Sequence, residues 1–238
     1  SSDLLRSWYM PPERLLDLCG QHRCRSLAFT YSEPVIFYEY MYDASAHVKP
    51  EGIHPVMISN GFIEPEPMKQ LAPYLSAVKI DLKAFTEKFY DETCGGHLQP
   101  VLDTLVLLKE LGLWFEIVVL IVPTLNDGEE ETRRMCGWIH KNLGPDVPLH
   151  FSRYHPTYKI QNIPPTPLKT LEQHHAIAIE SGLHYVYLGN LPGHQSESTC
   201  CPACGKVVIG RYGYHISSVN LSDGKCSHCS HPIAGVWS

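Results

Sequence analysis

The stretch Val78–Phe85, with the sequence VKIDLKAF, decides how the rest of the chain is interpreted. Apolar and polar residues alternate along it, which is the two-residue period of a β-strand. Asp81 and Lys83 therefore lie on one face, at the end where the strand stops. On an isolated strand this pair would indicate the solvated face of an antiparallel sheet, so its meaning depends on the neighbouring segments.

The composition is that of an ordinary globular protein. The chain has 238 residues, of which 44% are hydrophobic and 18% charged, and its formal net charge is -6. This length suits one large α/β domain or a domain with a small appendage. The acidic balance and the lack of basic runs argue against binding to nucleic acid or to an anionic membrane. The longest apolar run, Ile117–Val122, is too short to cross a bilayer.

The cysteines and the start of the chain bear on the compartment. There are nine cysteines, an odd number, and Cys19, Cys24, Cys94 and Cys136 are scattered through amphipathic segments. This pattern is typical of reduced thiols. No charged-then-apolar leader opens the sequence. We therefore expect a cytoplasmic protein without a membrane partner.

Short apolar segments alternate with amphipathic ones along most of the chain. The predicted strands are Ser26–Tyr31, Pro55–Ser59, Ala77–Leu82, Trp114–Val122, Leu149–Ser152 and Tyr185–Leu188. Helices are predicted close to the start of the chain and from near Pro34, Pro65, Leu98, Asp127 and Pro167. Strict alternation of this kind indicates right-handed βαβ units, and so an α/β fold with a parallel sheet or barrel.

Polar residues gather where the predicted strands end. These ends are Thr30–Pro34 (TYSEP), Ser59–Phe62 (SNGF), Asp81–Lys83 (DLK), Val122–Asp127 (VPTLND) and Ser152–Pro156 (SRYHP). In parallel α/β folds the carboxyl ends of the strands surround the binding site. We therefore predict a shared pocket for a small molecule, in which Lys83 holds a ligand carboxylate. Asp81 would balance that charge or help to bind a cation.

The last part of the chain has a different character. Residues 193–238 are rich in Pro, Gly, Ser and Cys and are too few for a hydrophobic core of their own. CPACG (Cys201–Gly205) and CSHC (Cys226–Cys229) are two C-x-x-C pairs with 21 residues between them. This spacing predicts a four-thiolate zinc ribbon made by Cys201, Cys204, Cys226 and Cys229, although iron fits the same ligands. With all four positions filled by protein, the site would be structural.

The order of these motifs, followed by YVYLGNLPGH (Tyr185–His194) and the two cysteine pairs, resembles the AmmeMemoRadiSam-system family of radical S-adenosylmethionine (SAM) enzymes. That family is related to the pyruvate formate-lyase activating enzymes. The resemblance covers nearly the whole chain. It implies that residues 1–192 form a partial (β/α)6-type parallel barrel lacking its first strand. Residues 193–238 would then be a small C-terminal zinc ribbon.

The resemblance also assigns roles in SAM binding. Glu33 would meet the SAM amino group, Lys83 the SAM carboxylate and Asp81 a monovalent cation. Ser59 and Asn60 would lie beside the ribose or a cation, and His155 would approach the ribose or adenine. Two positions depart from the activating enzymes: Tyr31 and Ser32 replace a pair of glycines, and Ile58 replaces an acid.

A further departure concerns the [4Fe–4S] cluster that a radical SAM enzyme holds with three closely spaced thiolates. No such cysteine triplet occurs in this sequence, and the strand that should carry it is also missing. The chain begins with Ser1 rather than Met. We therefore expect the cluster ligands upstream of Ser1, in a longer protein from which this chain is truncated. The rival interpretation is a degenerate barrel that has lost its cluster.

For the full-length protein the resemblance implies reductive cleavage of SAM to a 5′-deoxyadenosyl radical, which takes a hydrogen atom from an unidentified substrate. Relatedness to the activating enzymes favours a protein substrate. The family implies Memo-type and AMMECR-type partners and an electron donor. The 238-residue chain alone is expected to be inactive. The alternatives are a non-catalytic module that binds a partner, and a barrel enzyme that uses His155 with Asp81 or Glu33 as acid and base.

Overall fold

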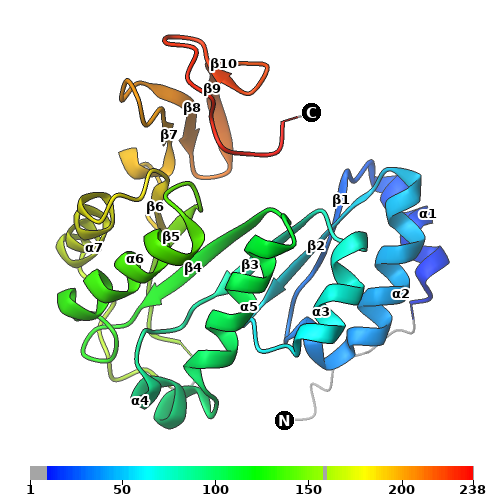
Figure 1. Ribbon diagram of the computed structural model, residues 1–238, viewed down its shortest axis with the longest axis horizontal. Helices are drawn as coiled ribbons and strands as arrows, with labels where there is room; N and C mark the ends of the chain where they lie inside the picture. The colour runs from blue at the N-terminus through cyan, green and yellow to red at the C-terminus, as the bar shows by residue number, and fades with distance from the viewer. Residues whose placement is uncertain (1–9, 158–159, 238) are drawn as a thin grey trace.

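The computed structural model describes residues 10–157 and 160–237. Its centre is a six-stranded parallel sheet in which the strands follow one another in sequence order (Figure 1). The strands are β1 (Ser26–Phe29), β2 (His54–Ser59), β3 (Ala77–Asp81), β4 (Phe115–Ile121), β5 (Leu149–Arg153) and β6 (Val186–Gly189). Each coincides with a predicted strand to within two residues at either end, and the predicted parallel α/β arrangement is confirmed.

The helices connect these strands in turn. They are α1 (Pro12–His22), α2 (Tyr38–Val48), α3 (Pro65–Leu71), α4 (Glu87–Phe89), α5 (Leu98–Glu110), α6 (Glu129–Leu143) and α7 (Leu168–Glu180). Single turns of 3₁₀ helix lie at Pro34–Phe37, Lys49–Glu51, Ala72–Tyr74 and Gln195–Glu197. Because every right-handed crossover steps to the next strand in the same direction, the helices collect on one face of the sheet. Within residues 10–157 and 160–237, no helix lies on the other face (Figure 1).

The ends of the longer helices follow from their sequences. Helix α5 stops before Gly112, which adopts a φ of +65°, and α6 stops at Gly144, which adopts a φ of +94°. Both values lie in the region that favours glycine. The first turn of α6 carries three successive acids, Glu129–Glu131, and negative charge there interacts favourably with the helix dipole. These predicted helices are thus confirmed, with α6 starting two residues later than expected.

Side-chain burial shows which face of the sheet is open. Every second residue of β4, from Phe115 to Ile121, is buried beneath the helices. The residues between them point to the other face, where Glu116 is half-buried and Leu120 is 38% exposed. The polar side chains at the strand ends therefore belong to a face that the helices do not cover.

The C-terminal segment forms two small antiparallel sheets. One contains β7 (Thr199–Cys200), β8 (Val207–Tyr212) and β9 (His215–Val219), and the other contains β10 (Leu221–Ser222) and β11 (Lys225–Cys226). They lie beside β4, β5 and β6 (Figure 1). Tyr185, just before β6, packs against Val208 and Ile233 and accepts a hydrogen bond at its Oη from the backbone N–H of Ala234 (3.1 Å). The division of the chain at residue 192 stays a prediction.

Among residues 10–157 and 160–237, no helix combines the length and the hydropathy needed to cross a bilayer.

A buried histidine joins two of the helices to the sheet. His174 of α7 is 1% exposed, its Nδ1 lies 2.6 Å from the Thr132 hydroxyl of α6, and its ring lies against Phe151 of β5. Burial lowers the pKa of this imidazole below its ordinary value, so the folded protein keeps it neutral.

This burial predicts a pH-dependent stability. Between about pH 7.5 and 5.5 the unfolded chain takes up a proton at His174 that the folded protein resists. The free energy of unfolding should therefore fall as the pH drops through this range. In urea titrations the fall should be smaller for His174→Gln, which removes the titrating group. An equal fall in both proteins would contradict the role given to His174.

Candidate functional site

Glu33 lies in the loop after β1 and is hydrogen-bonded to residues at the end of β2. Its Oε1 accepts a hydrogen bond from the Ser59 hydroxyl (2.6 Å), and its Oε2 accepts one from the Asn60 N–H (2.8 Å). The Val35 N–H also donates to Oε1 (3.3 Å), so that Glu33 caps the 3₁₀ turn that follows it. The structure thus brings Glu33, Ser59 and Asn60, three of the predicted site residues, into contact, while their roles in SAM binding stay predictions.

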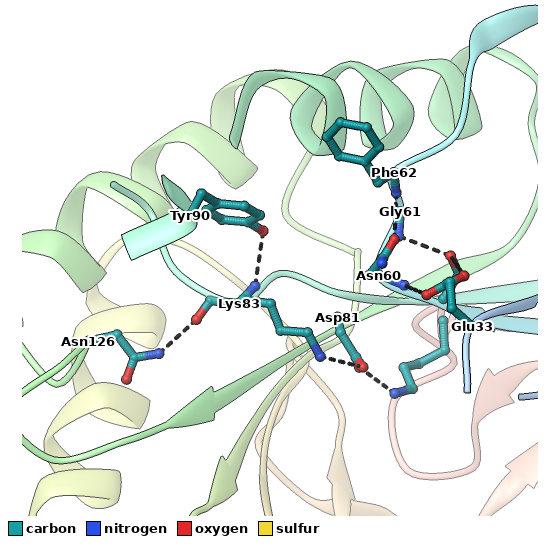
Figure 2. A network of polar contacts seen from close by, with 10 residues as sticks. Glu33, Asn60, Gly61, Phe62, Asp81, Lys83, Tyr90 and Asn126 are labelled. Carbon is teal, nitrogen blue, oxygen red and sulfur yellow. Dashed lines mark hydrogen bonds and ion pairs between the residues drawn. The ribbon is translucent and has the colours of Figure 1, made fainter. Parts of the chain in front are cut away.

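The SNGF turn after β2 presents Asn60 at this point. The Gly61 N–H donates to the Ser59 hydroxyl (3.0 Å), and the Phe62 N–H donates to the Asn60 Oδ1 (2.8 Å). Gly61 has a φ of +78°, and a Cβ there would meet Ile80 Cγ2 at 3.0 Å. Glycine is therefore required by both backbone conformation and space. Figure 2 shows this turn beside Glu33.

Two lysines share one carboxylate on the open face of β3. The Lys83 ammonium lies 2.9 Å from Asp81 Oδ2, and the Lys79 ammonium is bonded to Asp81 Oδ1. The side chains of Lys79, Asp81 and Lys83 are 30%, 27% and 40% exposed, so all three are partly screened by water. The predicted pairing of Asp81 with Lys83 is confirmed as a contact (Figure 2).

The backbone of Lys83 is held at both of its polar groups. Its N–H donates to the Tyr90 hydroxyl (3.1 Å), and its carbonyl accepts from Asn126 Nδ2 (2.7 Å) (Figure 2). Tyr90 is buried, and this burial raises the pKa of its phenol, which stays protonated at neutral pH. Side chains from two other elements therefore fix the position from which the Lys83 ammonium extends.

Asn126 also joins β3 to the loop after β4. Besides the Lys83 carbonyl, its Nδ2 donates to the Leu120 carbonyl (2.8 Å), and its Oδ1 accepts from the Val122 N–H (2.7 Å). The Asn126 side chain is buried, and each of these three hydrogen bonds goes to a backbone group.

Some of these residues line a cavity of about 510 Å³, whereas Lys79, Asp81 and Asn126 lie outside its lining. Its lining includes Glu33, Asn60, Lys83 and Tyr90, with the apolar side chains of Ile36 and Phe62. A volume of this size suits a small molecule. An acid and a base line the same space, and this arrangement can bind a ligand that carries both charges.

The predicted site residues do not all reach this cavity. Ser59 is buried beneath it, where its hydroxyl serves Glu33. His155 follows β5, is exposed and lies outside the cavity lining. Its predicted contact with ribose or adenine stays a prediction.

The sequence did not predict that three further residues belong to the site. Lys79 is the second partner of Asp81, and the alternation along β3 already placed it on the same face. Tyr90 lies in a π-helical turn, Tyr90–Cys94, after α4, and neither element was predicted. No sequence signal identifies its contact with Lys83, nor that of Asn126, because the partners come from separate elements.

The four ribbon cysteines converge in the way the spacing predicts. Their sulfur atoms all lie within 4.8 Å of one another, with Cys201 and Cys229 separated by 3.6 Å and Cys204 and Cys226 by 3.8 Å. A tetrahedron with metal–sulfur bonds of about 2.3 Å has edges of about 3.8 Å. The thiolates are therefore placed to bind one metal ion.

The two C-x-x-C turns have the same backbone arrangement. Gly205 donates its N–H to the Cys201 carbonyl, and Ser230 donates its N–H to the Cys226 carbonyl, each at 2.8 Å. Both residues have positive φ, +70° for Gly205 and +62° for Ser230. This repeated turn holds each pair of sulfurs towards the other pair. Across residues 10–157 and 160–237, no other group of three or more His, Cys, Asp or Glu side chains converges on a common point.

The chain has a relative among curated proteins, although no family model matches it. It is 42% identical over 226 residues to the uncharacterized protein MJ0808 of Methanocaldococcus jannaschii, a match that covers 94% of this chain and 67% of that protein. The chain belongs to the same family as this archaeal protein.

Several solved structures have a similar fold. A domain of pyruvate-formate lyase-activating enzyme from Bacteroides vulgatus has a TM-score of 0.61 at 17% identity, covering 69% of this chain and 98% of that one. Streptococcus suis SuiB bound to S-adenosylmethionine has a TM-score of 0.64 at 12% identity, covering 79% and 45%. A radical SAM methyltransferase from Sphaerobacter thermophilus has a TM-score of 0.60 at 11% identity, covering 82% and 60%. The six-stranded sheet and its helices therefore have the fold of radical SAM enzymes.

The contacts of Asn126 predict a measurable contribution to stability. Asn126→Ala removes one hydrogen bond from the buried Val122 N–H and one from each of two partly buried carbonyls, which should lower the free energy of unfolding by about 2–4 kcal/mol. Asn126→Asp should also destabilise the protein, because a carboxylate would face two carbonyl oxygens. Urea denaturation measures both variants. A loss of less than about 0.5 kcal/mol in the free energy of unfolding of both variants would contradict the stabilising role given to Asn126.

Proposed function

We propose that this chain supplies the SAM-binding part of a radical SAM enzyme. The observation that carries the proposal is the cavity with Lys83 and Glu33 in its lining. The amino-acid end of SAM has a carboxylate and an ammonium group, so it needs a base and an acid in one small space.

The hydrogen-bonding capacity of both side chains supports these roles. A lysine ammonium has three donors, and Lys83 uses one of them on Asp81, which leaves donors for a ligand carboxylate. The Glu33 carboxylate can accept about four hydrogen bonds and receives three from the protein. One further donor, the SAM ammonium, can be accommodated.

Other predicted residues take supporting parts in this proposal. Ser59 is a positioning residue, because it holds the Glu33 carboxylate from a buried position. Asn60 lines the cavity beside Glu33. Leu120, which is not one of the predicted site residues, lies outside the lining of this cavity, and its exposed side chain on the open face of the sheet would be an apolar surface for the adenine ring. The fold similarity to SuiB, whose structure contains SAM, agrees with a SAM site on this scaffold.

The [4Fe–4S] cluster does not fit the described residues. Cys19 is buried in α1 and Cys24 is exposed after it, with no third thiol beside them, and the ribbon cysteines form a closed set of four. A radical SAM cluster needs three thiolates and one open iron. We propose, as the resemblance implies, that its ligands lie elsewhere in the complete protein. A protein substrate and partners of the Memo and AMMECR types stay predictions of that resemblance.

We also propose that the ribbon cysteines hold a structural zinc ion. Four thiolates fill a tetrahedral shell and leave no position for a substrate, and the segment has only a small apolar cluster around Tyr185 and Val208. The free energy of metal binding would then stabilise its fold.

Lys83→Ala tests the SAM site. Removing a charge-assisted hydrogen bond should weaken SAM binding to the complete protein by about 1.5–3 kcal/mol, measured by isothermal titration calorimetry. Lys69→Ala, at an exposed position on α3, is the matched control and should bind as the wild type does. Unchanged affinity in Lys83→Ala would reject the assigned role.

Elemental analysis tests the ribbon. The wild type should contain one zinc per chain at this site, and the double variant Cys201→Ser, Cys204→Ser should lose it. Cys94→Ser, which alters an exposed thiol outside the ribbon, should keep the metal. Retention of zinc by the double variant would show that the ligand set is wrong, and iron in place of zinc would change the identity of the metal.

A further inference from the structure

The charges on the open face of β3 do not balance. Lys79 and Lys83 both contact Asp81, one at each carboxylate oxygen, so two positive charges face one negative charge. A single lysine would be enough to neutralise Asp81. The second ammonium group therefore changes the net charge next to Lys83, which lines the cavity.

The neighbours of these residues are unsuited to a metal cation. Across the sheet, Asp81 pairs in register with Val118, and Lys79 pairs with Ile58 on one side and Glu116 on the other. Val118 and Ile58 offer no side-chain oxygen. Hard cations such as the divalent ions that proteins bind take about six oxygen ligands, and Asp81 has both of its oxygens bonded to ammonium groups.

Glu116 does not compete strongly for Lys79. Its Oε2 lies 2.8 Å from His150 Nε2, and its Oε1 accepts a hydrogen bond from Trp114 Nε1 (3.4 Å). Burial acts to raise the pKa of Glu116, but the contacts with His150 and Trp114 and the nearby charge of Arg211 lower it below its ordinary value. Glu116 is therefore an ionised group with its own partners, and Lys79 is left to Asp81.

We propose that Lys79 is a built-in counter-cation for Asp81, which makes ligand binding at Lys83 independent of added Na⁺ or K⁺. This inference rests on the proposed SAM site. With Lys79 present, Asp81 is already neutralised, and the Lys83 ammonium can be shared with the ligand carboxylate. Without Lys79, Asp81 and Lys83 form a neutral pair, and Asp81 competes with the ligand for the remaining ammonium group. Lys79 is thus a positioning residue that acts through Asp81.

The test measures the dissociation constant for SAM in two salts of equal ionic strength, potassium chloride and choline chloride. Equal ionic strength keeps general screening constant, and choline is too large to replace an ammonium group beside Asp81. The complete wild-type protein should bind SAM equally in both salts. Lys79→Met keeps the apolar stem and removes the charge. It should bind about tenfold more weakly in choline chloride and recover part of this loss in potassium chloride.

Lys79→Arg is the matched control, because it keeps the charge and should bind in both salts as the wild type does. If the wild type binds SAM only in potassium chloride, the inference is overturned while the proposed SAM site stands. If Lys79→Met binds SAM with full affinity in choline chloride, the inference is likewise overturned and the proposed SAM site stands. If the wild type binds no SAM in either salt, the proposed function fails and takes the inference with it. Should Lys79→Met fail to fold, as judged by circular dichroism, the wild-type comparison still decides.

Discussion

Asp81 lies between two lysine ammonium groups, on the face of the sheet that none of the described helices covers. The face on which this contact lies is open because the parallel strands β1 to β6 follow one another in order, and right-handed crossovers then place the described helices on the opposite face. The same order brings the carboxyl ends of β1, β2 and β3 to one edge. Glu33 and Lys83, which are far apart in the sequence, therefore line a single cavity.

The site is held by partly buried polar contacts as well as by packing. Glu33 joins two strand ends through Ser59 and Asn60, and Asn126 joins two more through backbone groups. Such fully bonded contacts favour one arrangement, since any slip would leave buried polar groups unpaired. These contacts fix the backbone positions from which the Glu33 and Lys83 side chains extend into the cavity.

Local sequence patterns predicted most of the fold. They could not predict the contacts between residues that are far apart in the sequence. Each strand has its own alternation or apolar run, so all six were found from sequence. Asn126 bonds a residue 43 positions away, and no local pattern encodes that distance. Tyr90 lies in a π-helical turn whose periodicity is too brief to recognise. The contact of Lys79 with Asp81 could have been predicted, because the alternation that places Asp81 on the open face places Lys79 there too. His155 was predicted to contact the ligand because it follows β5. It lies outside the cavity lining, because tertiary contacts, which local sequence does not reveal, set the direction of a loop.

In the proposed site, Lys83 and Glu33 bind opposite charges of one ligand. A crystal structure of the complete protein with SAM would show whether they do. The SAM carboxylate should lie within about 3 Å of the Lys83 ammonium, and the SAM ammonium at a similar distance from the Glu33 carboxylate. SAM bound outside this cavity, or bound within it with neither contact, would overturn the proposed site.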